Sequence, residues 1–178
     1  MLPEIRSLTF LFDPLEDHAW MSHAAHVGRS TCREQNVDLQ TVRAATIPFP
    51  RWMSQIEPEH VVSSCRQHDI DYVSIGPLTL NQNQSFLESI PKLIESQEIL
   101  FASAEIADRS GRIDLDRIEM VADLILELST LTSQGRAMSN LYFCAMANCP
   151  PGSPFFPASY HDGKKAKLTI AVEGAPVA

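Results

Sequence analysis

Hydrophobic positions along the chain follow two periods, one typical of strands and one typical of helices. Apolar, β-rich runs predict strands at 4–12, 39–46, 71–77, 99–107 and 140–148, with a further candidate at 166–174. Segments with helical periodicity lie between them, at 16–36, 58–68, 84–97 and 114–135. Strand and helix therefore alternate along the whole chain.

Turn and capping residues support these boundaries. Asp13-Pro14 ends the first predicted strand, and Gly76-Pro77 ends the third. Pro58, followed by an acidic residue, is typical of the first turn of a helix. Pro91 lies inside the third predicted helix, and the fourth is predicted to end at Gly135.

This alternation predicts an α/β fold with a mainly parallel sheet of five to six strands built from β-α repeats. The runs "ILFASA" and "LYFCAMA" show no polar alternation, which is typical of parallel strands covered on both faces. With 178 residues, 44% of them hydrophobic, the chain is expected to form a single α/β domain over residues 1–178.

Composition excludes several classes of partner. The net charge of −8 and the pI near 5.1 argue against nucleic acid and anionic membrane surfaces, which both require clustered Lys and Arg. No apolar run approaches the roughly 20 residues that span a bilayer. The four cysteines show no C-x-x-C spacing, and the first residues lack the basic start of a secretory leader. We therefore expect a reduced, cytoplasmic setting.

Polar residues gather where the predicted strands end. They are Asp13 after the first strand, Arg43 in the second, Ser74 and Gly76 in the third, Glu105 near the end of the fourth, and Asn148 with Cys149 after the fifth. Parallel sheets bind ligands outside the carboxyl ends of their strands, where loops converge. The sequence therefore predicts a site for a small anionic metabolite at this rim.

Each of these residues also has a purely structural interpretation. Asp13 can cap the first helix, Gly76 can simply end a strand or allow a close approach, and Cys149 can be an ordinary buried or rim thiol. Arg43 lies among apolar residues, so its guanidinium needs either an anionic ligand or a carboxylate. Glu105 is the natural candidate for that carboxylate.

The segment "NCPPGSPFFPASYH", residues 148–161, is predicted to form a stiff Pro-rich rim loop. Its four prolines fix φ, so the segment can neither continue the sheet nor begin a helix. The two adjacent phenylalanines are expected to fold the loop back and bury at least one ring. Gly152-Ser153 offers N–H donors for an anion, and the loop returns Tyr160 and His161 to the cleft. The alternative is a structural plug.

Histidine and nucleotide-binding motifs add no further chemistry. His18, His23 and His26 lie on the first predicted helix, and His23 and His26 share one face. Without an H-E-x-x-H motif this spacing favours an ordinary histidine face, and no metal site is predicted. No P-loop, G-x-G-x-x-G or nucleophile elbow occurs, so the sequence assigns no cofactor.

Several strings together resemble the bacterial and archaeal family known as domain of unknown function 711. They are "EIRSLTFLF", "LQTVRAATIPFP", "DYVSIGPL", "GRID" and above all "NLYFCAMANCPPGSPFFPASYH". The resemblance implies a fold similar to pyruvate formate-lyase, in which two five-stranded halves form a ten-stranded α/β barrel. Family members are typically longer, so this chain corresponds to the first half. The family has no established activity, and no glycine here resembles a glycyl-radical loop.

Two function classes follow. The first is an enzyme or enzyme fragment in which Arg43 and Gly152-Ser153 bind an anion, while Glu105 or His161 moves protons and Cys149 is a candidate thiol. The second is a non-catalytic ligand-binding or assembly module that completes its barrel with another chain. A half-barrel exposes an apolar concave face, so we expect a homodimer or a partner chain to cover it.

Overall fold

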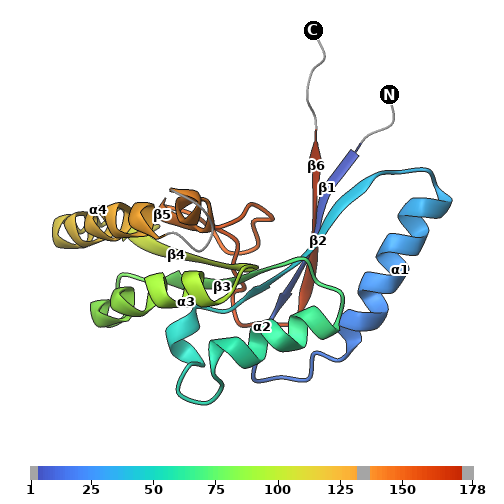
Figure 1. Ribbon diagram of the computed structural model, residues 1–178, viewed down its shortest axis with the longest axis horizontal. Helices are drawn as coiled ribbons and strands as arrows, with labels where there is room; N and C mark the ends of the chain where they lie inside the picture. Colours follow the sequence, from blue (N-terminus) through green and yellow to red (C-terminus); the bar gives the residue numbers. More distant parts are fainter. Residues whose placement is uncertain (1–3, 132–136, 174–178) are drawn as a thin grey trace, which may run out of the picture.

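A six-stranded sheet forms the centre of the computed structural model, which describes residues 4–131 and 137–173 (Figure 1). The strand order is β5-β4-β3-β2-β1-β6. Strands β1 to β5 pair in parallel, and β6 pairs antiparallel with β1. Their bounds are β1 (Glu4–Phe12), β2 (Leu39–Thr46), β3 (Tyr72–Leu78), β4 (Leu100–Ala107), β5 (Phe143–Ala147) and β6 (Lys167–Glu173). The predicted α/β class, mainly parallel sheet and β-α repeats are confirmed.

Helices cover one face of this sheet. They are α1 (Trp20–Glu34), α2 (Pro58–Gln67), α3 (Ile90–Ser96) and α4 (Leu115–Thr130), with short 3₁₀ helices η1 (Phe49–Arg51), η2 (Gln84–Ser89) and η3 (Met138–Tyr142). Apolar residues from α1, α2, α3 and α4 form one continuous core with alternate residues of β1 to β5. Because successive strands from β1 to β5 are added in one direction, crossovers of the same hand place all their helices on the same side.

Several element boundaries differ from the sequence prediction. α1 begins at Trp20 rather than residue 16, because Asp13 and Asp17 accept hydrogen bonds from the backbone of Leu15 and Ala19 and form turns there. The helix predicted at 84–97 divides into η2 and α3, with Pro91 in the first turn of α3, where a missing N–H is tolerated. α4 ends at Thr130, followed by an extended Leu131, so the helix stops before the predicted end at Gly135, which lies outside the described residues.

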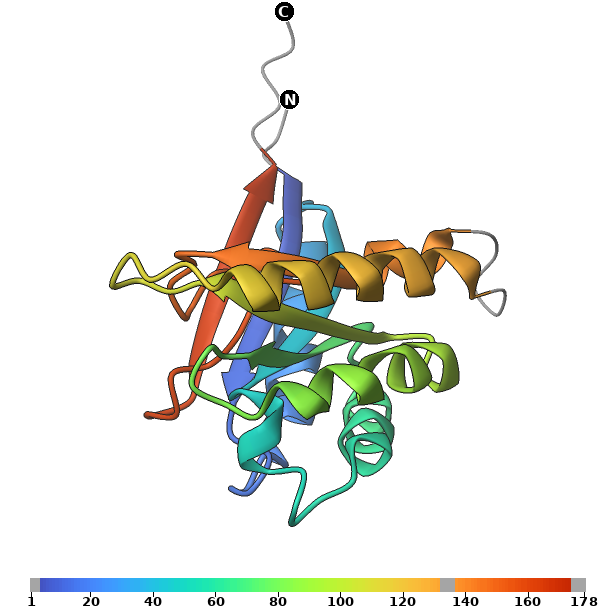
Figure 2. The same ribbon diagram turned by 90° about the vertical axis from the view of Figure 1, so that its left-hand side faces the viewer.

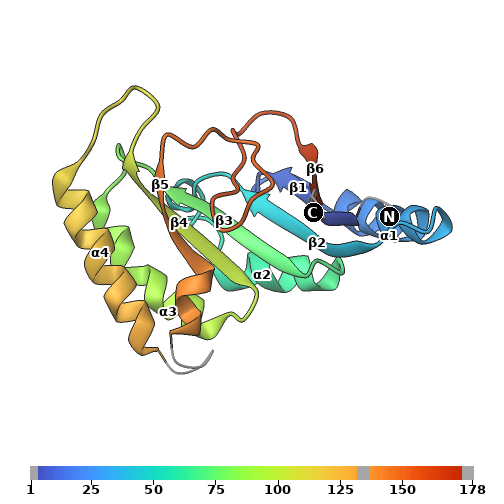
Figure 3. The ribbon, with the colours of Figure 1, turned by 90° about the horizontal axis from the view of Figure 1, so that it is seen from above.

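The other side of the sheet is called here the open face. Val42 and Ala44 belong to the core beneath the helices, so Arg43 between them points to the open face. On β4, Leu100 and Ala102 likewise face the helices. No helix of the described residues covers the open face. Instead, the segment joining β5 to β6 crosses it over β3 and β2 (Figure 3).

Strand β6 ends the sheet beside β1. Figure 2 shows the strong twist that turns β1 and β6 away from the direction of β4. Leu168, Ile170 and Val172 are 52%, 52% and 59% exposed, so the apolar side of this edge strand is only partly covered. No helix built from the described residues has the length and apolar character needed to cross a membrane.

Candidate functional site at the carboxyl edge of the sheet

A cavity of about 350 Å³ lies at the carboxyl ends of β3 and β4, and we call it the carboxyl-edge pocket. Its lining comes from the turn after β2, the loop after β3 and the turn after β4: Arg51, Thr79, Leu80, Asn81, Glu105, Asp108, Arg109, Ser110 and Arg112. This is where parallel sheets generally bind ligands, because the loops after successive strands converge there. Of the residues predicted for the site, Glu105 lines this pocket.

Glu105 is a half-buried carboxyl group on the open-face side of β4. Its Oε2 accepts a hydrogen bond of 3.0 Å from the backbone N–H of Leu80. Burial raises the pKa of Glu105, the charge of Asp108 raises it further, and the Leu80 hydrogen bond and the Arg117 charge act against this shift. The net result is a carboxyl group that holds a proton more readily than an exposed glutamate.

Three arginines line the same pocket as this carboxyl group, and they differ in their ion pairs. Arg112 Nη2 lies 3.2 Å from Asp114 Oδ2 in an ion pair. Arg51 and Arg109 are exposed and form no ion pair with the described residues. Asp108, the remaining acid of the lining, accepts hydrogen bonds from Ser110 N, Ser110 Oγ and Arg112 N. Two guanidinium groups therefore remain available to an anion.

Sequence reasoning missed these arginines although a usable signal was present. Arg51 ends the segment that follows the second strand, and Arg109 lies two residues after the fourth strand ends. The rule that selected Asp13 and Asn148, position directly after a strand, does not reach them, because Arg109 lies two residues beyond the end of β4 and Arg51 five residues beyond the end of β2. The signal that identifies both is a positively charged side chain within the turn that follows a strand.

The Pro-rich segment returns to the sheet beside the pocket. Tyr160 is buried, and its hydroxyl donates a 3.1 Å hydrogen bond to Cys149 O. Burial, together with the charge of Glu105 and against the opposing charges of Arg109 and Arg51, raises the pKa of Tyr160 to about 12. Tyr160 is therefore a neutral hydroxyl electrostatically coupled to the pocket charges.

Other residues of this segment are engaged in holding it together. The Gly152 N–H donates to Tyr160 O over 2.9 Å, and Ser153 Oγ accepts from Phe155 N. His161 is 1% exposed, its Nε2 donates to Lys164 O at 2.9 Å, and its Nδ1 lies 3.4 Å from Asp162 Oδ1. Because a carbonyl only accepts, Nε2 carries the proton. These contacts give Gly152, Ser153 and His161 structural roles within the loop.

The residues predicted at the ends of β1 and β5 lie at the carboxyl edge but outside the pocket lining. Asp13 Oδ1 accepts from Leu15 N in a tight turn. Asn148 has a left-handed backbone with φ of 55°, and its N–H donates to Ala107 O. Cys149 Sγ lies 3.8 Å from Ala147 O, and all cysteines are free thiols. Asp13 and Asn148 thus shape turns.

Ser74 and Gly76 lie within β3, which continues through Gly76-Pro77 to Leu78 and does not end there as predicted. Ser74 Oγ lies 2.8 Å from Ser159 O and 3.2 Å from Pro157 O, so it attaches the Pro-rich segment to β3. Gly76 has φ of +77°, and a Cβ there would lie 2.8 Å from Ile47 O. A side chain at this position would collide with backbone, which explains the glycine without a ligand.

Arg43 and Glu105 form no ion pair. Arg43 lies beside Tyr72, the first residue of β3, whereas Glu105 is near the carboxyl end of β4. Arg43 Nε donates to Thr41 Oγ1 at 2.8 Å. The structure therefore separates the two residues into different parts of the open-face side.

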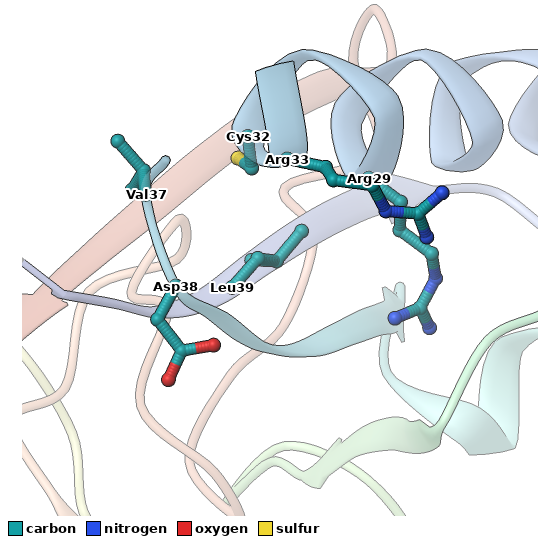
Figure 4. A pocket seen from close by; sticks show the side chains of 6 residues that line it. All are labelled: Arg29, Cys32, Arg33, Val37, Asp38 and Leu39. Carbon is teal, nitrogen blue, oxygen red and sulfur yellow. The ribbon is translucent and has the colours of Figure 1, made fainter. Parts of the chain in front are cut away.

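A further hollow of about 280 Å³ lies between the end of α1 and the start of β2 (Figure 4). Figure 4 shows the Asp38 carboxylate pointing away from the guanidinium groups of Arg29 and Arg33. Arg29 already pairs with Asp69 at 3.1 Å and with Asp71 at 2.8 Å. These ion pairs of Arg29 join α1 to the loop before β3. Within residues 4–131 and 137–173, no group of three His, Cys, Asp or Glu side chains is arranged to hold a metal ion.

Comparisons with known proteins agree with the resemblance noted in the sequence. The profile of the family described as "Uncharacterised ACR (DUF711)" matches residues 16–178. A UPF0210 protein of Methanopyrus kandleri, MK1214, is 30% identical over 97 residues, which cover 53% of this chain and 21% of the relative. The matched segment thus spans about a fifth of the length of that curated relative.

Proposed function

Because the chain belongs to the uncharacterised DUF711 family, whose name assigns no reaction, we propose its function from the carboxyl-edge pocket: it binds a small anionic metabolite there and moves a proton on it. One observation carries this proposal. Arg51 and Arg109, which form no ion pair with the described residues, line the same pocket as Glu105, a half-buried carboxyl group of raised pKa.

The division of roles follows from charge and hydrogen bonding. Arg51 and Arg109 supply planar donors suited to a carboxylate or phosphate group. Glu105 keeps one carboxyl oxygen on Leu80 N, which fixes its orientation, and the other oxygen carries or accepts the proton. A carboxyl pKa shifted toward neutrality suits general acid–base catalysis. Proton transfer to or from a bound small anion is therefore the reaction class that these groups support.

The first experiment is a thermal-shift screen with small carboxylates and phosphates, since a ligand that binds only the folded chain raises its melting temperature. A hit is expected to lose its stabilising effect in the double variant Arg51→Ala/Arg109→Ala. Arg66→Ala, an exposed arginine on α2, is the control for removal of a positive charge. A hit that stabilises the double variant as strongly as the parent chain contradicts the proposal.

The second experiment separates binding from chemistry. For a carboxylate hit, exchange of its α hydrogen with deuterated solvent is followed by proton NMR. Glu105→Gln is expected to leave binding within about threefold and to slow exchange by at least about a hundredfold. Equal exchange in both proteins assigns Glu105 no part in the reaction.

A second candidate function is assembly, and the exposed apolar side of β6 favours it. Five parallel strands with helices on one face only are also what one half of a pyruvate formate-lyase-like barrel requires. On this proposal a second copy or a partner chain covers β6 and the open face. Sedimentation of the purified chain at micromolar concentration tests it, and a stable monomer with no partner present contradicts it.

A further inference from the structure

Another cavity, of about 260 Å³, is lined by Arg43 on the open face, and we call it the Arg43 pocket. Its lining is Arg43, Tyr72, Phe101, Leu141, Tyr142 and Phe156. None of these residues lines the carboxyl-edge pocket. Arg43 and Phe101 project from β2 and β4, Tyr72 begins β3, and Tyr142 directly precedes β5, so four adjacent strands build the floor.

Four aromatic rings form the walls, with Phe101 at their centre. The Phe101 ring centroid lies 5.5 Å from that of Tyr72, 4.7 Å from that of Tyr142 and 5.3 Å from that of Phe156. Phe156 comes from the Pro-rich segment, which Ser74 holds against β3. The same segment leaves Phe155 66% exposed. The loop therefore supplies one ring to this pocket.

The Arg43 guanidinium lies among these rings. Its central carbon is 5.2 Å from the Phe156 centroid and 5.8 Å from the Tyr72 centroid, within the range of cation–π contact. Nε donates to Thr41 Oγ1 over 2.8 Å, which fixes the plane of the group. Burial lowers the pKa of Arg43, and the nearby charge of Arg6 acts in the same direction. A partly desolvated cation of this kind gains from a bound anion.

Asp71, the acidic residue whose charge acts on Arg43, already accepts hydrogen bonds from other groups. Asp71 favours the charged form of Arg43, but its Oδ2 accepts from Arg29 at 2.8 Å and from Val42 N at 2.7 Å. Among the described residues, Arg43 has no carboxylate within ion-pair distance. Its two terminal nitrogens form no hydrogen bond with the described residues either.

We propose that the Arg43 pocket binds a small monocarboxylic acid with a planar, unsaturated body about the size of one aromatic ring. The carboxylate pairs with the terminal nitrogens of Arg43 in the bidentate geometry that a guanidinium favours. The body of the ligand packs against the edges and faces of the four rings. A volume of about 260 Å³ suits one ring and is small for a nucleotide or a larger cofactor.

Benzoate is the probe that tests this proposal, titrated into the full chain and followed by chemical-shift changes in two-dimensional NMR. We expect a roughly millimolar dissociation constant, as befits a ligand of this size. Benzamide keeps the ring and removes the charge, and acetate keeps the charge and removes the ring. Both are expected to bind at least about tenfold more weakly than benzoate. Binding of benzamide or acetate as tight as that of benzoate overturns the proposal.

Two variants locate the binding site. Arg43→Gln removes the charge, and Phe156→Leu removes a ring supplied by the loop; each is expected to weaken benzoate binding at least about fivefold. Arg66→Ala and Arg51→Ala/Arg109→Ala are expected to leave it unchanged. If the double variant loses benzoate and Arg43→Gln keeps it, the probe occupies the carboxyl-edge pocket and this inference fails, whereas the proposed function is unaffected.

Folding and self-association are controlled in the same samples. Far-ultraviolet circular dichroism and thermal unfolding establish that each variant is folded. If Arg43→Gln does not fold, Phe156→Leu and the comparison of benzoate with benzamide still test whether benzoate binds in the Arg43 pocket, because neither alters Arg43. If benzoate leaves the spectrum of the parent chain unchanged while Arg43→Gln changes its sedimentation, the face is a protein interface and the ligand proposal is wrong.

Discussion

The two faces of the sheet differ in their cover and in their side chains. β4 shows this within one strand: Leu100 and Ala102 lie in the core beneath the helices, whereas Phe101, Ser103 and Glu105 alternate with them on the other side. The helix-covered face is apolar and buried, with phenylalanines of β1 and β5 among its aliphatic residues. The open face carries an arginine, serines, aromatic rings and a glutamate, with a loop rather than a helix across it.

The two faces therefore divide two roles: the helix-covered face holds the hydrophobic core, and the open face carries the polar and aromatic side chains. The helix-covered face buries its residues against α1, α2, α3 and α4 and supplies most of the hydrophobic stabilisation. The carboxyl-edge pocket and the Arg43 pocket both draw on side chains that the strands direct away from that core. Substitutions on the two faces should therefore affect stability very differently, even one residue apart.

The largest effect is expected on the helix-covered face. Leu100→Ala removes a side chain that is 0% exposed, so lost burial and a cavity should lower the free energy of unfolding by about 3 kcal/mol. Urea denaturation measures this change. Leu115→Ala, at a leucine that is 75% exposed, is the matched control and should cost less than about 0.5 kcal/mol. Similar losses at both positions would show that the core is not where the packing places it.

An intermediate effect is expected where the loop attaches to the open face. Ser74→Ala removes the hydroxyl that contacts Ser159 O and Pro157 O and should cost about 1 to 2 kcal/mol. Hydrogen exchange should also accelerate at the amides of Gly152 and His161, whose bonds hold the same loop. Ser153→Ala is the control within the loop. Unchanged exchange in Ser74→Ala would mean that other contacts hold the segment.

A smaller, pH-dependent effect is expected at Glu105. Its pKa is raised in the folded chain. The contribution of Glu105 to the free energy of unfolding is therefore most favourable below the unfolded pKa of about 4.3, and it is lost as the pH rises through the folded pKa. Glu105→Gln removes this loss. The variant should be more stable than the parent at pH 7, by less than about 1 kcal/mol because the group is only half-buried, and the advantage should disappear near pH 4. Urea titrations across this range check the sign, and an advantage that grows toward low pH refutes it.

The smallest effect is expected for a buried hydroxyl on the open face. Ser103 Oγ is buried and has no hydrogen-bond partner among the described residues. Ser103→Ala therefore removes an uncompensated polar group and should change stability by less than about 0.5 kcal/mol, or increase it. Thr9→Val tests the same idea on β1, since Thr9 Oγ1 is also unpaired within the described residues. A loss above about 1.5 kcal/mol in both variants would show that these hydroxyls have partners.

The site was only partly predictable from the sequence. Position near the carboxyl end of a strand directed attention to this edge, where Glu105 lines a pocket, because parallel strands end together. It did not separate Asp13 and Asn148, which shape turns, from Arg51 and Arg109, which line the pocket. Local sequence does not distinguish these roles, since a polar side chain after a strand either caps its own backbone or extends into a cavity.

By itself the sequence determined the α/β class, the mainly parallel order and the strand positions, because hydrophobic periodicity and proline and glycine punctuation act over short distances. It also determined that residues 148–161 could be neither strand nor helix. Only the tertiary structure decided that Arg43 lies among aromatic rings rather than beside Glu105, and that Ser74 anchors the loop. Such contacts join residues from separate strands and loops. They depend on the register of the sheet and on the path of the loop, which local sequence patterns do not determine.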